Sequence, residues 1–159
     1  MRNLLRYAGI ACVSFSLVSA AHAIQTFSIT QGVPVIQHVD LGKPGASHGD
    51  LLAFEASFTT KDGKKGTMSG LITTVSLPTG AGDEFLDRIG TIILDFGGID
   101  SLVITGKSVY GSGEGEMKDN APQVRAVTGG TGRFIGARGQ ISTTRSSAGK
   151  YEHVIKLLD

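Results

Sequence analysis

The sequence predicts an all-β protein that folds as a closed, eight-stranded antiparallel β-barrel. Its apolar side chains recur with a period of two residues, which is the period of a strand and not the 3.6 of a helix. Turn residues, such as Lys61-Asp62-Gly63 and Pro78-Thr79-Gly80, separate the alternating segments. Glycines also fall inside these segments, where they suit the sharp bends of a barrel wall.

Each expected strand is an alternating segment that ends where turn residues begin. In chain order the expected strands are Thr26–Gln31, Val35–Asp40, Leu51–Thr60, Thr67–Leu77, Arg88–Phe96, Ser101–Tyr110, Gln123–Thr128, Arg138–Arg145 and Lys150–Leu158. A short helix is expected at Asp83–Asp87. Segments of this length and spacing are typical of an antiparallel barrel or sandwich, and the internal glycines favour the barrel.

The first 23 residues have the features of a secretory signal peptide. Arg2 and Arg6 precede an apolar run that is too short to span a membrane, and Ala21-His22-Ala23 is a cleavage site of the A-x-A type. The alternative interpretation is a core helix. We therefore expect a mature domain of residues 24–159, located in the periplasm or secreted, with no membrane span.

Composition excludes several kinds of function. Without Arg2 and Arg6, 13 of the 15 basic residues remain against 14 acidic ones, so no nucleic-acid partner is expected. The single cysteine, Cys12, lies in the signal segment, which excludes disulfides and thiol catalysis in the mature chain. His38, His48 and His153 lack metal-ligand spacing, so no metal site is expected.

The segment Ala126–Gly139, with the sequence AVTGGTGRFIGARG, contains a glycine motif with two interpretations. A dinucleotide-binding turn needs G-x-G-x-x-G before a helix, whereas Gly130, Gly132 and Gly136 are spaced one residue too far apart. The residues that follow are glycine-rich and β-branched, which disfavours a helix. We therefore expect no nucleotide cofactor, and no cofactor of another kind.

Three blocks in consistent order resemble the allene oxide cyclase and dirigent barrel families. The blocks are Ser47–Phe54 continuing into Thr60–Gly66, Asp100–Gly106, and Thr128–Ala137 followed by Gly139-Gln140. The resemblance implies an eight-stranded antiparallel barrel, a homo-trimer, and a lumen that holds a small hydrophobic molecule.

The resemblance does not carry over the families' reactive groups. The first strand lacks the glutamate of the plant cyclases, Glu55 or Ala56 stands where they have an asparagine, and Ile72 stands where they have a cysteine. Dirigent proteins match at Arg138, in their A-R-G motif. At Arg133, however, they carry an aspartate. Plant-type cyclase chemistry is therefore not expected.

The candidate site is built around Arg138, which the resemblance places in the lumen. Alternation puts Arg138 on one face with Phe134, Gly136 and Gln140. An arginine in an apolar lumen must be paired or reserved for a ligand. The candidate catalytic residues are Arg138 and Asp95, and the candidate ligand-binding residues are Arg138, Phe134, Glu55, Tyr110 and Arg133. Asp95 as an exposed strand-end residue and Arg133 as a solvated turn residue remain the alternatives.

Three function classes follow. The first is a dirigent-like barrel that binds a small hydrophobic or phenolic molecule and steers its conformation. The second is an isomerase or cyclase that acts on a reactive, unsaturated, oxylipin-like substrate in the same lumen. The third is a structural barrel with a filled interior, against which the many Ser, Thr and Gly positions argue.

Overall fold

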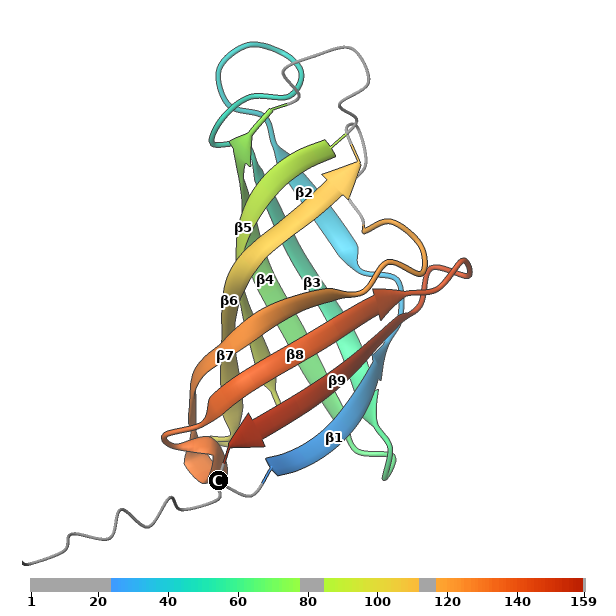
Figure 1. Ribbon diagram of the computed structural model, residues 1–159, viewed down its shortest axis with the longest axis vertical. Coiled ribbons are helices and arrows are strands. Elements are labelled where there is room, and N and C mark those ends of the chain that lie inside the picture. Colours follow the sequence, from blue (N-terminus) through green and yellow to red (C-terminus); the bar gives the residue numbers. More distant parts are fainter. Residues whose placement is uncertain (1–23, 78–84, 112–116, 159) are drawn as a thin grey trace, which may run out of the picture.

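The computed structural model describes residues 24–77, 85–111 and 117–158, and within them the chain consists of strands and their connections, with a single 3₁₀ turn (Figure 1). The elements are β1 (Ile24–Gln31), β2 (Val35–Val39), β3 (Leu51–Thr60), β4 (Lys65–Ser76), β5 (Phe85–Asp95), β6 (Ser101–Gly111), β7 (Gln123–Thr131), the 3₁₀ turn η1 (Gly132–Phe134), β8 (Arg138–Arg145) and β9 (Tyr151–Leu158). The predicted signal peptide lies outside the described residues.

The sheet closes on itself through β1 and β3. Neighbouring strands pair antiparallel in the order β1-β9-β8-β7-β6-β5-β4-β3-β2, and β1 also pairs with β3. The lower part of β3, Phe58–Thr60, bonds to β1, whereas its upper part, Leu51–Glu55, bonds to β2. Eight strands therefore form the barrel, and β2 continues the wall beside β3. The predicted closed, eight-stranded all-β barrel is confirmed.

One element differs from the prediction. The helix expected at Asp83–Asp87 is wrong for its last three residues, because β5 begins at Phe85 and pairs along its whole length with β6. Its first two residues lie outside the described part of the chain. Pairing partners on both sides outweigh the local helical preference of a short segment.

The glycine motif after β7 forms the connection to β8. Gly132 has a positive φ of 57°, and a Cβ there would collide with the carboxylate of Asp100. That carboxylate instead accepts a hydrogen bond from the backbone N–H of Arg133, with an N···Oδ1 distance of 2.9 Å. The motif is therefore a hairpin connection pinned to the β5–β6 turn region, and not a phosphate-binding loop.

An apolar core fills the lower half of the barrel as it is drawn in Figure 1. Its large side chains include Ile29, Leu94, Leu102 and Ile155, each at most 1% exposed. Below them Phe27, Phe58, Phe96 and Phe134 pack ring against ring, with centroids 5.1 to 6.4 Å apart. We call this the aromatic end of the barrel.

Candidate functional site

The buried polar side chains gather at the opposite end, which we call the polar end. Four of them lie near the ends of β1, β4, β6 and β8, namely Gln31, Thr74, Ser108 and Thr143. The other three lie near the starts of β5, β7 and β9, namely Arg88, Arg125 and His153. Adjacent strands are antiparallel, so these positions face one end. All seven side chains are at most 6% exposed. Burying so many polar groups is costly and calls for an explanation.

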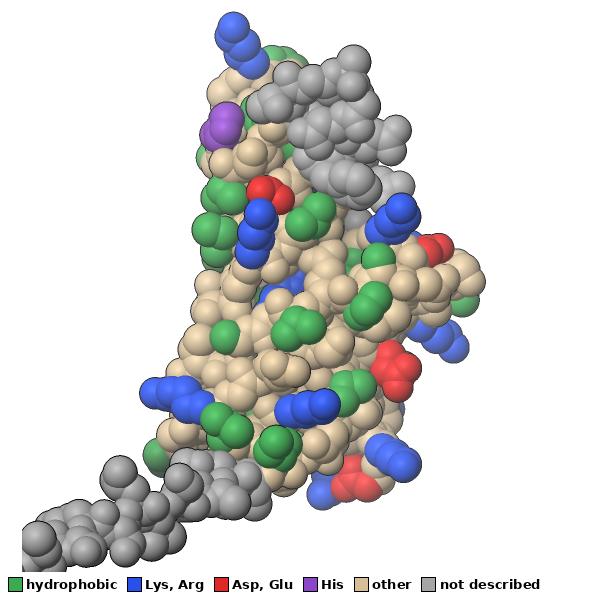
Figure 2. All heavy atoms as spheres, viewed as in Figure 1, with side chains coloured by type: hydrophobic (Ala, Val, Ile, Leu, Met, Phe, Trp, Pro, Cys, Tyr) green, Lys and Arg blue, Asp and Glu red, His purple; other side chains and the backbone are tan. Residues whose placement is uncertain are grey.

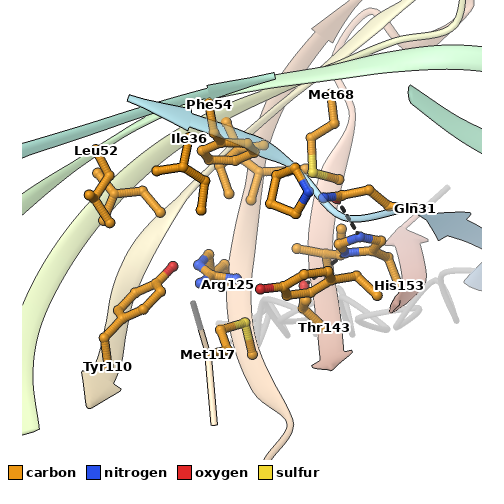
Figure 3. A pocket seen from close by; sticks show the side chains of 16 residues that line it. Gln31, Ile36, Leu52, Phe54, Met68, Tyr110, Met117, Arg125, Thr143 and His153 are labelled. Atoms are coloured by element: carbon orange, nitrogen blue, oxygen red, sulfur yellow. Dashed lines mark hydrogen bonds between the residues drawn. The ribbon is translucent and has the colours of Figure 1, made fainter. Parts of the chain in front are cut away.

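A cavity of about 50 Å³ lies among these residues, inside the lumen (Figure 3). Its walls are mostly apolar and include Ile36, Leu52, Phe54, Met68, Ile72 and Met117. Its polar groups are Gln31, Tyr110, Arg125, Thr143, Tyr151 and His153. An apolar cavity with a few convergent polar groups is the usual form of a small-molecule site.

Arg125 carries the charge of this cavity. It is the third residue of β7 and shares the inward face with Val127. Its side chain is 4% exposed, and its Nε donates to the Ser108 hydroxyl at 2.8 Å. Burial lowers the pKa of Arg125, an effect opposed by its hydrogen bond and charge interaction with Tyr110. Within the described part of the chain, no carboxylate pairs with it.

Tyr110 lies between two guanidinium groups. Figure 3 shows Tyr110 and Arg125 pointing toward one another across the cavity. The guanidinium carbon of Arg88 is 4.7 Å from the centre of the Tyr110 ring. Burial raises the pKa of Tyr110, although Arg125 and Arg88 act in the opposite direction. The phenol therefore stays protonated at neutral pH and can donate a hydrogen bond.

His153 is held neutral by a three-residue hydrogen-bond chain. Its Nε2 lies 3.0 Å from Gln31 Oε1, and its Nδ1 lies 3.0 Å from the Thr143 hydroxyl. Because the amide oxygen only accepts, Nε2 carries the proton and Nδ1 accepts from Thr143. Burial, with a smaller contribution from Arg125, lowers the pKa of His153 to about 3. Both ring nitrogens are thus engaged.

A second cavity, of about 240 Å³, lies beyond Leu52 toward the polar end. Arg88 lines it, and its Nε donates to the Thr74 hydroxyl at 3.3 Å. Asp50 also lines it, and its carboxylate accepts hydrogen bonds from the backbone N–H groups of Leu41 and Ser47. These bonds lower the pKa of Asp50 and hold the loop between β2 and β3. They give the Gly49-Asp50-Leu51 block a structural role.

Arg138 does not point into the lumen, and that expectation is corrected. Its side chain is exposed, and its Nη1 donates to the carbonyl oxygens of Thr128 and Ala137, at 2.8 and 2.9 Å. The 3₁₀ turn η1 interrupts the alternation, so Phe134 is buried while Arg138 and Gln140 face outward. Within β8 the inward positions are those of Ile141 and Thr143.

The other predicted site residues are spread over the barrel. Asp95 is exposed, and its Oδ1 accepts from the backbone N–H of Gly97; Glu55 is exposed and accepts from the Ser69 hydroxyl. Their hydrogen-bond partners are thus different from those of Arg138, which are backbone carbonyls. Phe134 lies in the aromatic end, where Arg133 covers its ring at 4.7 Å and forms an ion pair with Asp100 at 3.3 Å. Of the six predicted residues, Tyr110 is the one that lines the lumen cavity.

Tyr151 and four further polar residues of the cavity were not among the predicted site residues. The four are Gln31, Arg125, Thr143 and His153. Each shares a strand face with a buried aliphatic side chain two residues away, namely Ile29, Val127, Ile141 and Ile155. A polar residue in phase with the core is therefore the sequence signal that identifies them.

In residues 24–77, 85–111 and 117–158, no three His, Cys, Asp or Glu side chains are grouped so that they could hold a metal ion. Over the same residues, no helix is long and apolar enough to cross a membrane.

The fold and the cavity define a class of protein, the closed antiparallel β-barrel with a mostly apolar lumen cavity that contains a few polar side chains. No family model and no curated protein matches the chain. Solved structures do. A pyocyanin demethylase has a TM-score of 0.60 at 20% identity, covering 85% of this chain and 99% of that one. The pterocarpan synthase dirigent protein GePTS1 has a TM-score of 0.57 at 19% identity, and the match covers 96% of each chain.

The Diels Alderase AbmU from Streptomyces koyangensis has a TM-score of 0.61 at 16% identity, covering 89% of this chain and 70% of that one. The chain thus has the barrel fold of dirigent proteins and of cyclase barrels. The resemblance predicted from the sequence blocks is confirmed at the level of the fold.

Proposed function

We propose that this barrel binds a small, largely apolar or phenolic molecule in its lumen and holds it in one conformation, in the manner of a dirigent protein. The observation that carries the proposal is the Arg125–Tyr110 pair at the wall of an otherwise apolar cavity. Both groups donate hydrogen bonds, so an oxygen of the ligand would accept from them while Leu52, Phe54 and Ile72 pack against its apolar body.

The size of the cavity bears on how a ligand would enter. Its volume of about 50 Å³ is smaller than the roughly 150 Å³ of an engineered cavity that binds benzene. Met68 and Met117 line it, and methionine side chains rearrange easily because they are unbranched. We expect a bound ring to displace these two thioethers. The names of the similar structures, which include a pyocyanin demethylase and a Diels Alderase, also support a small-molecule role.

Calorimetric titration with 4-nitrophenol tests the proposal. Ile72 on β4 lines the cavity and is 4% exposed, whereas Ile89 on the adjoining strand β5 is 53% exposed. Ile72→Phe fills the cavity and should abolish binding, whereas Ile89→Phe should leave one site per chain. Circular dichroism of both variants confirms that the barrel remains folded. Equal binding by both variants, or no binding by the unmodified protein, would overturn the proposal.

A second candidate is an isomerase or cyclase that acts on an unsaturated carbonyl compound in the same lumen. The observation that favours it is the protonated Tyr110 beside Arg125, because two donors in a low-dielectric site would polarise a carbonyl oxygen. Turnover distinguishes the two functions. A cyclase releases a product isomeric with its substrate, whereas a binding protein returns the ligand unchanged, as mass spectrometry with chromatography would detect.

We also propose that the protein is exported and associates with copies of itself. Export rests on the signal-like segment of residues 1–23, and a mature mass beginning near Ile24 would support it. Self-association rests on the family resemblance and on a groove over β3, β4 and β5, lined by Val33, Val35, Leu71 and Ile93. Exposed apolar side chains also lie on the face drawn in Figure 2. Light scattering should give a trimer mass, and Leu71→Glu should reduce it.

A further inference from the structure

Among the residues that the structure describes, no carboxylate pairs with the positive charge of Arg125 in the lumen cavity. Four strands present titratable or polar groups to Arg125. β6 presents Ser108 and Tyr110, β9 presents Tyr151 and His153, β8 presents Thr143, and β1 presents Gln31. None of these is an acid. Asp50 lies at the second cavity, where its charge acts on Arg88.

The groups around Arg125 remain neutral over the ordinary pH range. His153 accepts no proton there because burial and Arg125 lower its pKa to about 3. Tyr110 loses none because burial raises its pKa. Arginine itself stays charged in proteins. The described lining of the cavity therefore combines the fixed charge of Arg125 with neutral donors and acceptors.

Leaving a cation unbalanced in an apolar cavity is unfavourable, and an anion of the right size would remove that cost. We propose that the lumen takes its ligand as an anion, a phenolate or carboxylate whose charged oxygen lies against Arg125 and Tyr110. The inference rests on the proposed function and narrows its ligand class to apolar acids. The guanidinium of arginine also presents several N–H donors in one plane, which match the oxygens of an anion better than the compact ammonium of lysine does.

Binding at this site would change the ionisation of the ligand. A site that prefers the charged form of an acid lowers the pKa of that acid when it binds. A neutral isostere should bind more weakly, and an apolar amine should not bind. Arg88, on the face of the Tyr110 ring, adds positive potential in the same direction.

The test uses 4-nitrophenol, because its phenol and phenolate forms differ in colour. Absorbance titrations with and without saturating protein report the ionisation state of the bound probe. We expect the bound probe to ionise at least one pH unit lower than the free probe, which corresponds to a tenfold preference for phenolate. 4-Nitroanisole, which cannot ionise, should bind at least tenfold more weakly.

Two variants assign the effect to Arg125. Arg125→Met should abolish the shift, and Arg125→Lys, which keeps the charge, should retain part of it. Lys156→Met removes an exposed cation on β9 and should retain the whole shift. Retention of the full shift in Arg125→Met, or its loss in Lys156→Met, would overturn the inference.

The outcomes separate this inference from the function on which it rests. If neither probe binds, the lumen is not a ligand site and both fail. If both probes bind with similar affinity and the nitrophenol titration is unshifted, the lumen binds neutral molecules, and the anion inference alone is overturned.

Discussion

At the aromatic end of the barrel, Phe58 and Phe96 meet edge to face at 5.2 Å, and the interior is filled. At the polar end, inward positions of the same sheet hold Arg125 and His153, and a cavity remains. The same strands form both ends, and their side chains alternate inward and outward in the same way. The two ends therefore differ only in which side chains face the interior. The polar lining does not follow from the needs of folding, because an apolar lining would cost less.

The two ends of the barrel therefore have different roles. The aromatic end supplies the packing that keeps the barrel closed. The polar end gives up part of that stabilisation to place a cation and hydrogen-bond donors around a cavity. Substitutions at the aromatic end should affect mainly stability, and those at the polar end mainly binding and pH dependence.

The largest effect is expected at Phe58, which is 1% exposed. Phe58→Ala removes a ring from the centre of the aromatic end and should lower the free energy of unfolding by about 3–5 kcal/mol. Urea denaturation followed by circular dichroism measures it. Thr59→Ala, at the neighbouring exposed position, should change stability by less than about 0.5 kcal/mol. Similar losses in both variants would contradict a packed aromatic end.

His153 should make the stability of the barrel depend on pH. The fold keeps the imidazole neutral with a pKa of about 3, whereas in the unfolded chain it accepts a proton below about 6.5. Its contribution is therefore present above pH 6.5 and is lost as the pH falls toward 3. The slope is about 1.4 kcal/mol per pH unit, or roughly 3 kcal/mol by pH 4.

His153→Gln should remove that slope while it retains hydrogen-bonding groups. His48→Gln, at an exposed position, serves as its control and should keep the slope of the unmodified protein. Urea unfolding at pH 7, 5.5 and 4 measures all three proteins. Parallel stability curves for the His153 variant and the unmodified protein would show that this histidine is not held neutral by the fold.

The two ends also differ in how far the sequence predicts them. The strand bounds follow closely, since Leu51–Thr60 and Arg138–Arg145 were predicted without error. Period-two patterning and turn chemistry are local, and they suffice for the wall. The lining of the polar end depends on which face of each strand points inward. A single irregularity in the alternation reverses the inward and outward faces of the strand that follows it.

That irregularity is the turn η1, across which Phe134 is buried and Arg138 is exposed. The family resemblance, which was the ground for expecting Arg138 in the lumen, does not show this change of face. The phase of β8 could have been taken from Ile141, an aliphatic residue that must face the core, and it would have placed Arg138 outward. The same rule applied to Val127 identifies Arg125. The Gln31–His153 bond joins residues 122 positions apart, and no local pattern predicts it.

Arg125 and Arg138 provide a direct comparison of an inward and an outward arginine. Arg125→Met should weaken 4-nitrophenol binding at least tenfold, about 1.4 kcal/mol, and leave stability within about 1 kcal/mol or raise it, because a buried cation is replaced by an apolar chain. Arg138→Met should leave binding unchanged. Calorimetry and urea unfolding of both variants give the answer, and the reverse pattern would favour the site predicted from sequence.

The smallest effect is expected at Tyr110, where one hydroxyl is removed and the ring remains. Tyr110→Phe deletes a single donor beside Arg125 and keeps the ring that faces Arg88, so the cavity should keep its shape. One hydrogen bond to a ligand contributes about 0.5–1.5 kcal/mol, so the affinity for 4-nitrophenol should fall by roughly threefold to tenfold. The ionisation shift of the bound probe should persist, because Arg125 supplies the charge. A variant that loses the shift but binds normally would make Tyr110, and not Arg125, the group that selects the anion.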